Sequence, residues 1–158
     1  MNNNIMQLVA PQSLKISKFF PHFLAVLSVF LVVAAHAGDL VVDLVVVVEN
    51  IESDKGNVRA AIFNNSKGFT KNPLMGQSIS AKVGSVSFIF KNIPMGQYAV
   101  SAFHDMNANQ KLDTNFVGKP VEPYGFSGDA RGMFGPPSFE DASIQINENV
   151  KTVSIHVK

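Results

Sequence analysis

The chain has 158 residues, of which 46% are apolar and 16% are charged, and its mean hydropathy is +0.16. Its formal net charge is +1, and the 121 residues after position 37 carry 11 basic and 12 acidic side chains. This near-neutral balance argues against a nucleic-acid partner and excludes a polybasic membrane-surface segment, because both require a basic face. The absence of cysteine excludes disulfides, thiolate metal sites and a cysteine nucleophile.

The first 37 residues have the pattern of a secretory signal peptide. A polar stretch with two lysines precedes an apolar run, and Ala35 and Ala37 supply the small residues expected before a cleavage site. The alternative is an uncleaved anchor helix, but the uninterrupted apolar run, 23–35, is shorter than the ~20 residues that a membrane span needs. We therefore expect 1–37 to be removed, leaving 38–158 as one domain, periplasmic or secreted, without a membrane span.

The rest of the chain alternates short apolar runs with turn residues, which is typical of β-strands. The valine-rich stretch 40–48 and the stretch 57–64 flank a turn at 53–56, and together they predict a β-hairpin. Further runs predict strands at 78–83, 85–90, 97–104, 143–147 and 152–158, the last two paired with each other. About seven strands without a sustained helical period predict an all-β fold, an antiparallel β-sandwich.

Residues 105–142 interrupt the strand pattern. This segment holds five of the 11 glycines and four of the eight prolines, and a short helical turn after Ser138 is its only regular element. Segments of this length without strands or helices are usually functional or disordered, and the aromatic side chains favour order because they can bury apolar area. We expect an ordered loop on the sandwich. Its aromatic residues are more typical of a small core than of a ligand platform; they are Phe116, Tyr124, Phe126 and Phe134.

The first nine residues of this segment have the spacing of a calcium-binding loop. Oxygen-bearing side chains occupy positions 1, 3, 5 and 9, and position 7 offers a carbonyl; the residues are Asp105, Asn107, Asn109, Asp113 and Lys111. Glu122 or Asp129 is a candidate for a further ligand. The alternative is a set of Asx-turns that hold the loop without an ion, because Gln110 replaces the glycine of the sharp turn and Phe116 replaces the closing glutamate.

Several motifs make the chain similar to a known family. They are Phe90 to Val100, His104 to Asn109, Leu112-Asp113, Gly118 to Ser127 and Gly135 to Phe139. On these residues the chain resembles a bacterial exported family known only as domain of unknown function 2141. The resemblance covers nearly all of 40–158, and it implies a bacterial exported protein without implying an activity. The turn Pro94 to Tyr98 is also similar to that of prealbumin-like sandwiches, which implies an Ig-like or prealbumin-like arrangement. The family typically has Asn-Gly where this chain has Asn109-Gln110.

Two hypotheses for function follow. The first is an exported, non-catalytic binding module for an envelope or extracellular partner, with 105–142 as a recognition loop that calcium orders. Its candidate binding residues are His104, Glu122, Tyr124, Phe126, Asp129, Arg131 and Phe134. The alternative is a small periplasmic hydrolase or isomerase that uses His104 with a loop carboxylate. We favour the first, because His104 and Asp105 point to opposite faces of a strand and Ser127 lacks the context of a nucleophile elbow.

Overall fold

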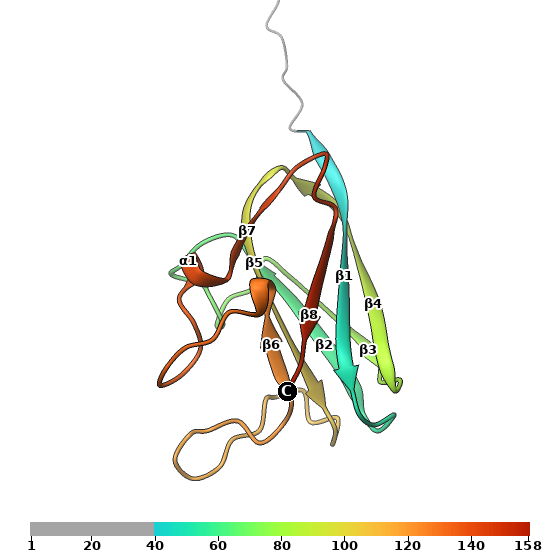
Figure 1. Cartoon of the computed structure of the whole chain (residues 1–158), viewed down its shortest axis with the longest axis vertical. Coiled ribbons are helices and arrows are strands. Elements are labelled where there is room, and N and C mark those ends of the chain that lie inside the picture. Colours follow the sequence, from blue (N-terminus) through green and yellow to red (C-terminus); the bar gives the residue numbers. More distant parts are fainter. Residues whose placement is uncertain (1–39) are drawn as a thin grey trace, which may run out of the picture. The chain divides into compact units, whose positions relative to one another are not determined.

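The computed structural model describes residues 40–158, and the predicted signal peptide lies outside the described residues (Figure 1). The described part contains eight strands; they are β1 (Val41–Ile51), β2 (Asn57–Phe63), β3 (Met75–Ser80), β4 (Gly84–Pro94), β5 (Gly96–Asp105), β6 (Tyr124–Phe126), β7 (Ser143–Ile146) and β8 (Thr152–His156). Two short helical turns accompany them; these are η1 (Ser127–Asp129) and α1 (Phe139–Ala142). The predicted all-β sandwich is confirmed. Within 40–158 no helix has the length and apolar character that crossing a membrane requires.

The strands form two sheets, one with the order β4-β1-β8 and one with the order β3-β2-β5-β6, in which β7 also pairs with β5. β1 pairs antiparallel with β4 and parallel with β8. β1 and β2 therefore lie in different sheets, as do β7 and β8, and both predicted hairpins are wrong. A turn signal marks a reversal of the chain, but a chain that crosses between sheets also reverses, so the turn alone does not fix pairing.

The core lies between the two sheets and takes every second side chain of the strands. Along β1, Leu44, Val46 and Val48 are fully buried, while the intervening valines are half-buried on the other face. In β8 and just after it every second residue is also buried; these residues are Val153, Ile155 and Val157. Alternating burial on β1 shows that the valine run is a sandwich strand with one face in the main core.

A second, smaller core covers the outer face of the five-stranded sheet. Its buried members are Phe63, Phe69, Ala99, Phe126, Phe139 and Ala142. The Phe69 ring lies at its centre, with ring centroids 5.3 Å from Phe63, 5.7 Å from Phe126 and 5.8 Å from Phe139. Aromatic packing, edge-to-face with Phe139 and tilted with Phe126, attaches α1 and β6 to the sheet. Part of segment 105–142 is thus packed on the sandwich, as expected.

Candidate functional site

Segment 105–142 leaves the sheet at the end of β5 and returns to it as β6. β6 pairs with β5 from Ser101 to Phe103, and the remainder forms two loops, which we call the first loop (106–123) and the second loop (130–138) (Figure 1). The strand β6 was not predicted, because three residues are too few for an alternating pattern. The helical turn after Ser138 is present as α1, with the Ser138 hydroxyl accepting the Asp141 N–H at 3.1 Å.

Strand β6 also contacts the other sheet. The Lys158 N–H donates to the Tyr124 carbonyl at 3.2 Å, next to the end of β8. A Cβ atom at Gly125 would lie only 2.7 Å from the carbonyl oxygen of His156, so a glycine permits this close approach. The hydroxyl of the fully buried Ser127 accepts the Val100 N–H at 2.8 Å. These contacts fix the point from which both loops project.

Asp105 holds the start of the first loop. Its side chain is fully buried, and its two carboxylate oxygens accept the N–H groups of Asn109 at 3.0 Å and Gln110 at 2.8 Å. A buried carboxylate is stable only when its oxygens accept several hydrogen bonds, and backbone N–H donors meet this need. The residue predicted as the first calcium ligand therefore organises the turn with its side-chain carboxylate, which accepts the backbone N–H groups of the turn.

Glu122 closes the first loop from its other end. Its buried carboxylate accepts the Met106 N–H at 2.9 Å through Oε1 and the Asp113 N–H at 3.0 Å through Oε2. Sequence reasoning placed Glu122 near this loop as a candidate metal ligand. It does fold back onto the loop, where it bridges two backbone positions seven residues apart in the chain and makes the base of the loop rigid.

The remaining predicted calcium ligands also come together. The side-chain amides of Asn107 and Asn109 donate to the two carboxylate oxygens of Asp113 at 2.7 and 2.9 Å. The oxygen of Asn107 accepts the Asn109 N–H, and that of Asn109 accepts the Lys111 N–H at 2.8 Å. These are the Asx-turns of the alternative interpretation. Among residues 40–158 no group of three His, Asp or Glu side chains is placed to hold a metal ion.

Two backbone positions show why the first loop needs particular residues. Gln110 has a φ of 69°, in the left-handed region that favours glycine, and this is the position where the resembled family typically has glycine. Gly56, which also has a φ of 69°, packs directly on the start of the loop, and a Cβ atom there would overlap the carbonyl oxygen of Asp105. The turn between β1 and β2 thus supports the base of the first loop.

His104 is buried and fixed by the turn beneath it. Its Nε2–H donates to the Lys55 carbonyl at 2.8 Å, and its backbone N–H donates to the Pro123 carbonyl at 2.8 Å. Glu122 is engaged with the first loop, and Asp129 with a different histidine. Neither of these two loop carboxylates forms a hydrogen bond with His104, so the geometry assembles no acid–base pair at this position.

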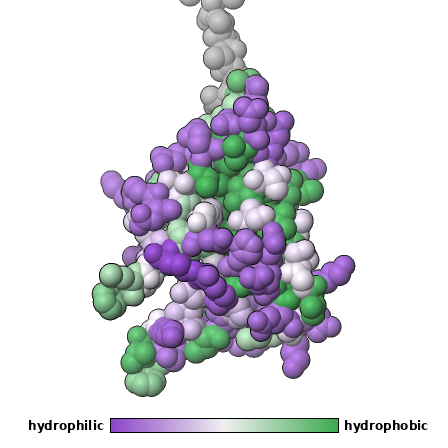
Figure 2. All heavy atoms as spheres, in the orientation of Figure 1, coloured by the Kyte–Doolittle hydropathy of each residue, from purple (hydrophilic) through white to green (hydrophobic). Residues whose placement is uncertain are grey.

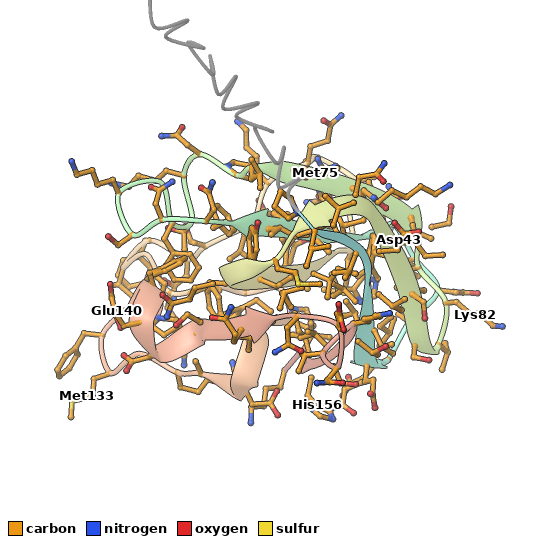
Figure 3. All side chains as sticks on the ribbon, turned by 90° about the horizontal axis from the view of Figure 1, so that it is seen from above. Asp43, Met75, Lys82, Met133, Glu140 and His156 are labelled. Carbon is orange, nitrogen blue, oxygen red and sulfur yellow. The ribbon has the colours of Figure 1, made fainter. Side chains whose placement is uncertain are left out.

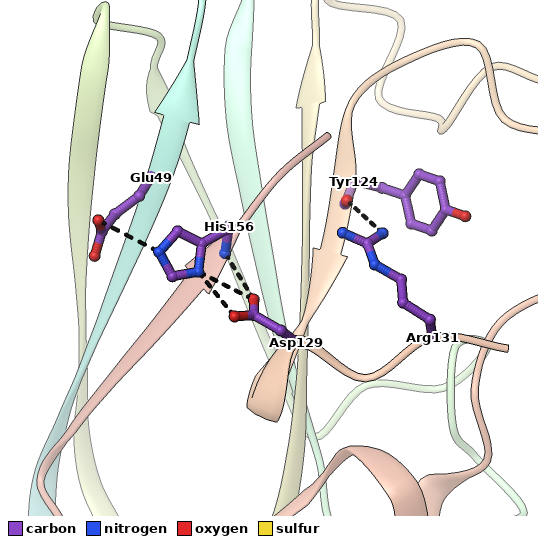
Figure 4. Close-up of polar contacts among 5 residues, drawn as sticks. All are labelled: Glu49, Tyr124, Asp129, Arg131 and His156. Carbon is purple, nitrogen blue, oxygen red and sulfur yellow. Dashed lines mark hydrogen bonds and ion pairs between the residues drawn. The ribbon is translucent and has the colours of Figure 1, made fainter.

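Asp129 instead pairs with His156 at the end of β8 (Figure 4). The Asp129 carboxylate lies 2.9 Å from Nδ1 of the ring and accepts the His156 backbone N–H at 3.2 Å, while Glu49 lies 3.7 Å from Nε2. Burial acts to raise the pKa of the Asp129 carboxyl, but these hydrogen bonds and the charges of His156 and Lys158 outweigh it and hold the pKa below its ordinary value. The pair joins η1 to β8.

Arg131, at the start of the second loop, is braced on an aromatic residue. Its guanidinium donates to the Tyr124 carbonyl at 3.4 Å and lies 5.5 Å from the centroid of the Tyr124 ring (Figure 4). Only part of its five-donor capacity is used by this contact. Arg131 therefore places a positive charge beside the second loop, and this contact leaves several of its N–H donors available to a ligand.

The aromatic residues divide into two groups, and the predicted small core is wrong for one of them. Phe126 is buried and Tyr124 half-buried, but the Phe116 side chain is 99% exposed and that of Phe134 is 101% exposed. The reason at Phe116 is a tight hairpin closed by a bridge between Thr114 and Pro120, which holds the apex away from any neighbour. Further apolar side chains on the loops are exposed; they are Val117, Val121 and Met133.

A groove of about 610 Å³ separates the ends of the two loops. Its lining is mainly apolar, and among its residues are Phe103, Leu112, Lys119, Pro120, Tyr124 and Phe134. Figure 2 shows the two loops as separate projections with hydrophobic ends and a gap between them. Sequence reasoning identified Tyr124, Phe126 and Phe134, which line the groove, whereas His104, Glu122 and Asp129 serve to hold the structure around it.

The comparisons with known proteins give a family without an activity. Residues 46–154 match the family described as "Uncharacterized protein conserved in bacteria (DUF2141)". No curated protein and no solved structure matches the chain significantly. The resemblance inferred from the motifs is confirmed over more than half of the chain. The chain belongs to the bacterial family DUF2141.

Proposed function

We propose that the domain is an exported, non-catalytic binding module whose recognition surface is formed by the ends of its two loops. The observation that carries this proposal is the exposure of four large apolar side chains at the ends of the two loops; they are Phe116, Val117, Met133 and Phe134. Val117 lines the groove from the first loop, and Met133 and Phe134 line it from the second. Single exposed apolar residues are common on protein surfaces, but a gathering of large ones at adjacent loop ends is typical of an interaction site.

The rigidity of the loop base supports the same function. Binding surfaces are commonly loops that a stable scaffold positions, because an ordered loop loses little conformational entropy when the partner binds. Asp105 and Glu122 fix four backbone N–H groups at the base of the first loop. The hydrophobic residues at the loop ends make none of these hydrogen bonds. The fold therefore does not dictate which residues stand there, and they can be suited to a partner.

Three forms of the mature domain, the wild type and two variants, test the proposal by capture from envelope extracts of the exporting cell. Replacement of both Phe116 and Phe134 by serine should leave thermal unfolding unchanged and abolish capture of the components that the wild type retains. Val83→Ser is the matched control, because Val83 is also exposed and lies on the turn between β3 and β4. Equal capture by all three proteins would overturn the proposal.

We also propose that the protein is exported. This is supported by residues 1–37, in which two lysines, an apolar run and small residues follow one another as in a signal peptide. The protein recovered from the periplasm or the medium should begin at Gly38. Terminal sequencing of that fraction measures this directly, and a protein that retains Met1 and stays in the cytoplasm would contradict it.

We further propose that calcium orders the first loop, on the support of the oxygen spacing from Asp105 to Asp113. Binding would require the amides of Asn107 and Asn109 to turn their oxygens inward, at the loss of their bonds to Asp113. With an affinity of about 10⁻⁴–10⁻³ M, calcium at about 10 mM should stabilise the fold by roughly 1–3 kcal/mol. An unchanged unfolding midpoint would leave the Asx-turns as the whole account of the loop.

A further inference from the structure

The exposed ends of the two loops contain no acidic side chain. Residues 114–121 and 130–137 each carry one basic residue, Lys119 and Arg131 respectively, and otherwise only neutral ones. The acidic residues of the long segment all lie outside these ends; they are Asp105, Asp113, Glu122, Asp129, Glu140 and Asp141. A surface that combines apolar and positive groups complements a partner that is both apolar and negatively charged.

The shape of the surface narrows the choice of partner. The apolar side chains lie at the ends of two projections that a groove separates, so they do not form a continuous flat patch (Figure 2). A rigid protein surface would need two matching pockets to receive them. A fluid bilayer accepts each end independently, with aromatic and aliphatic side chains at the acyl boundary and Lys or Arg at the level of the headgroups.

We propose that both loop ends insert into the surface of a bilayer that contains anionic lipid. In this arrangement Phe116, Val117, Met133 and Phe134 enter the acyl boundary, while Lys119 and Arg131 face lipid phosphates. The inference rests on the proposed function and assigns a partner to its recognition surface. The chain after position 37 has 11 basic and 12 acidic residues, so its net charge attracts anionic lipid little. Apolar insertion therefore supplies most of the affinity, and salt weakens membrane binding only modestly.

The absence of tryptophan from the chain permits a direct test. A single tryptophan is introduced by Phe116→Trp, by Phe134→Trp or, as a control, by Val83→Trp. Lys82, next to Val83, lies on the opposite side of the domain from Met133 (Figure 3). With vesicles of phosphatidylcholine and phosphatidylglycerol, tryptophan at 116 and at 134 should shift its emission to shorter wavelength and be quenched by brominated lipid, whereas tryptophan at 83 should do neither.

Sedimentation with the same vesicles separates the apolar and the charged contributions. Replacing Phe116 and Phe134 by serine should weaken partitioning by at least about tenfold, since each buried phenylalanine side chain is worth a factor of this order. Replacing Lys119 and Arg131 by glutamine should weaken binding to anionic vesicles and leave binding to pure phosphatidylcholine unchanged. Val83→Ser and Lys82→Gln are the matched controls and should bind like the wild type.

Two results overturn the inference, and they differ in what they mean for the proposed function. In the first result, the emission of tryptophan at 116 and 134 is unchanged by vesicles, while capture from envelope extracts still depends on the two phenylalanines. The partner is then a protein, and only the lipid assignment fails. If neither vesicle binding nor capture depends on the two phenylalanines, the recognition surface itself is wrong. Thermal unfolding of each variant, measured alongside, shows that the fold is intact.

Discussion

The base and the ends of segment 105–142 reverse the usual distribution of polar and apolar side chains. At the base, the carboxylates of Asp105 and Glu122 are buried, whereas at the ends the rings of Phe116 and Phe134 are fully exposed. The buried carboxylates are stable because each accepts two backbone N–H groups. The comparison shows that polar residues anchor the first loop and that the exposed aromatic residues are free for another role.

The largest expected effect on the base comes from the turn beneath it. Gly56→Ala places a methyl group where the Asp105 carbonyl lies and forces alanine into a positive φ, so we expect the free energy of unfolding to fall by about 3 kcal/mol. Chemical denaturation measures this. Gly76→Ala is the control, because the added atom would have its nearest neighbour at 3.9 Å. Equal stability of the two variants would show that the turn does not support the loop.

Glu122→Gln should have the next largest effect. The substitution removes the negative charge and turns an amide N–H toward one of two backbone donors, at a cost of about 2 kcal/mol in the free energy of unfolding. The exposed Glu140 supplies the matched control, and Glu140→Gln should change stability by less than about 0.5 kcal/mol. If Glu122→Gln changed the free energy of unfolding as little as Glu140→Gln, the base of the loop would not depend on this carboxylate.

The sequence predicted individual strands better than their pairing. The apolar alternation that marks the strand after Gly96 depends only on which face of a strand is buried, and β5 follows it. Pairing depends on contacts between distant segments, such as the parallel register of Val46 with Val153, which leaves no local signal. The chain reversal at 53–56 was therefore correct as a turn and wrong as a hairpin.

The same limit applies to the site. The oxygen spacing from Asp105 to Asp113 correctly located a compact polar loop, because Asx-turns and calcium loops need the same local residues. The exposure of Phe116 and Phe134 was not predictable, since aromatic residues in a long segment are buried in most proteins. The pairing of His156 with Asp129 joins residues 27 positions apart in the chain, and no sequence motif predicts it.

Gln110→Gly tests the backbone of the first loop with a smaller effect of opposite sign. Glycine tolerates the φ of 69° found at this position, so the variant should gain about 0.5–1 kcal/mol in the free energy of unfolding. Gln110→Ala is the control that removes the side chain but keeps the strain, and it should gain nothing. A gain of equal size in both would assign the effect to the side chain.

The smallest expected effect concerns the link between η1 and β8. The folded-state pKa of Asp129 is lowered, so its contribution to stability is present above the ordinary carboxyl value of 3.8 and is lost as pH falls through the lower folded value. Since the group is half-exposed, Asp129→Asn should cost only a few tenths of a kcal/mol at pH 5. The free energies of unfolding of the wild type and of Asp129→Asn, measured as a function of pH, should converge near pH 2. Curves that diverge further as pH falls would contradict this assignment.

Hydrogen exchange of the domain, alone and with envelope membranes of the exporting cell, tests both halves of the comparison at once. In the free domain the amides of Met106, Asn109, Gln110 and Asp113 should already exchange slowly, because the buried carboxylates of Asp105 and Glu122 accept their hydrogen bonds. Membranes should add protection only over 114–121 and 130–137. New protection confined to the outer face of the three-stranded sheet, with none at the loop ends, would contradict the central claim.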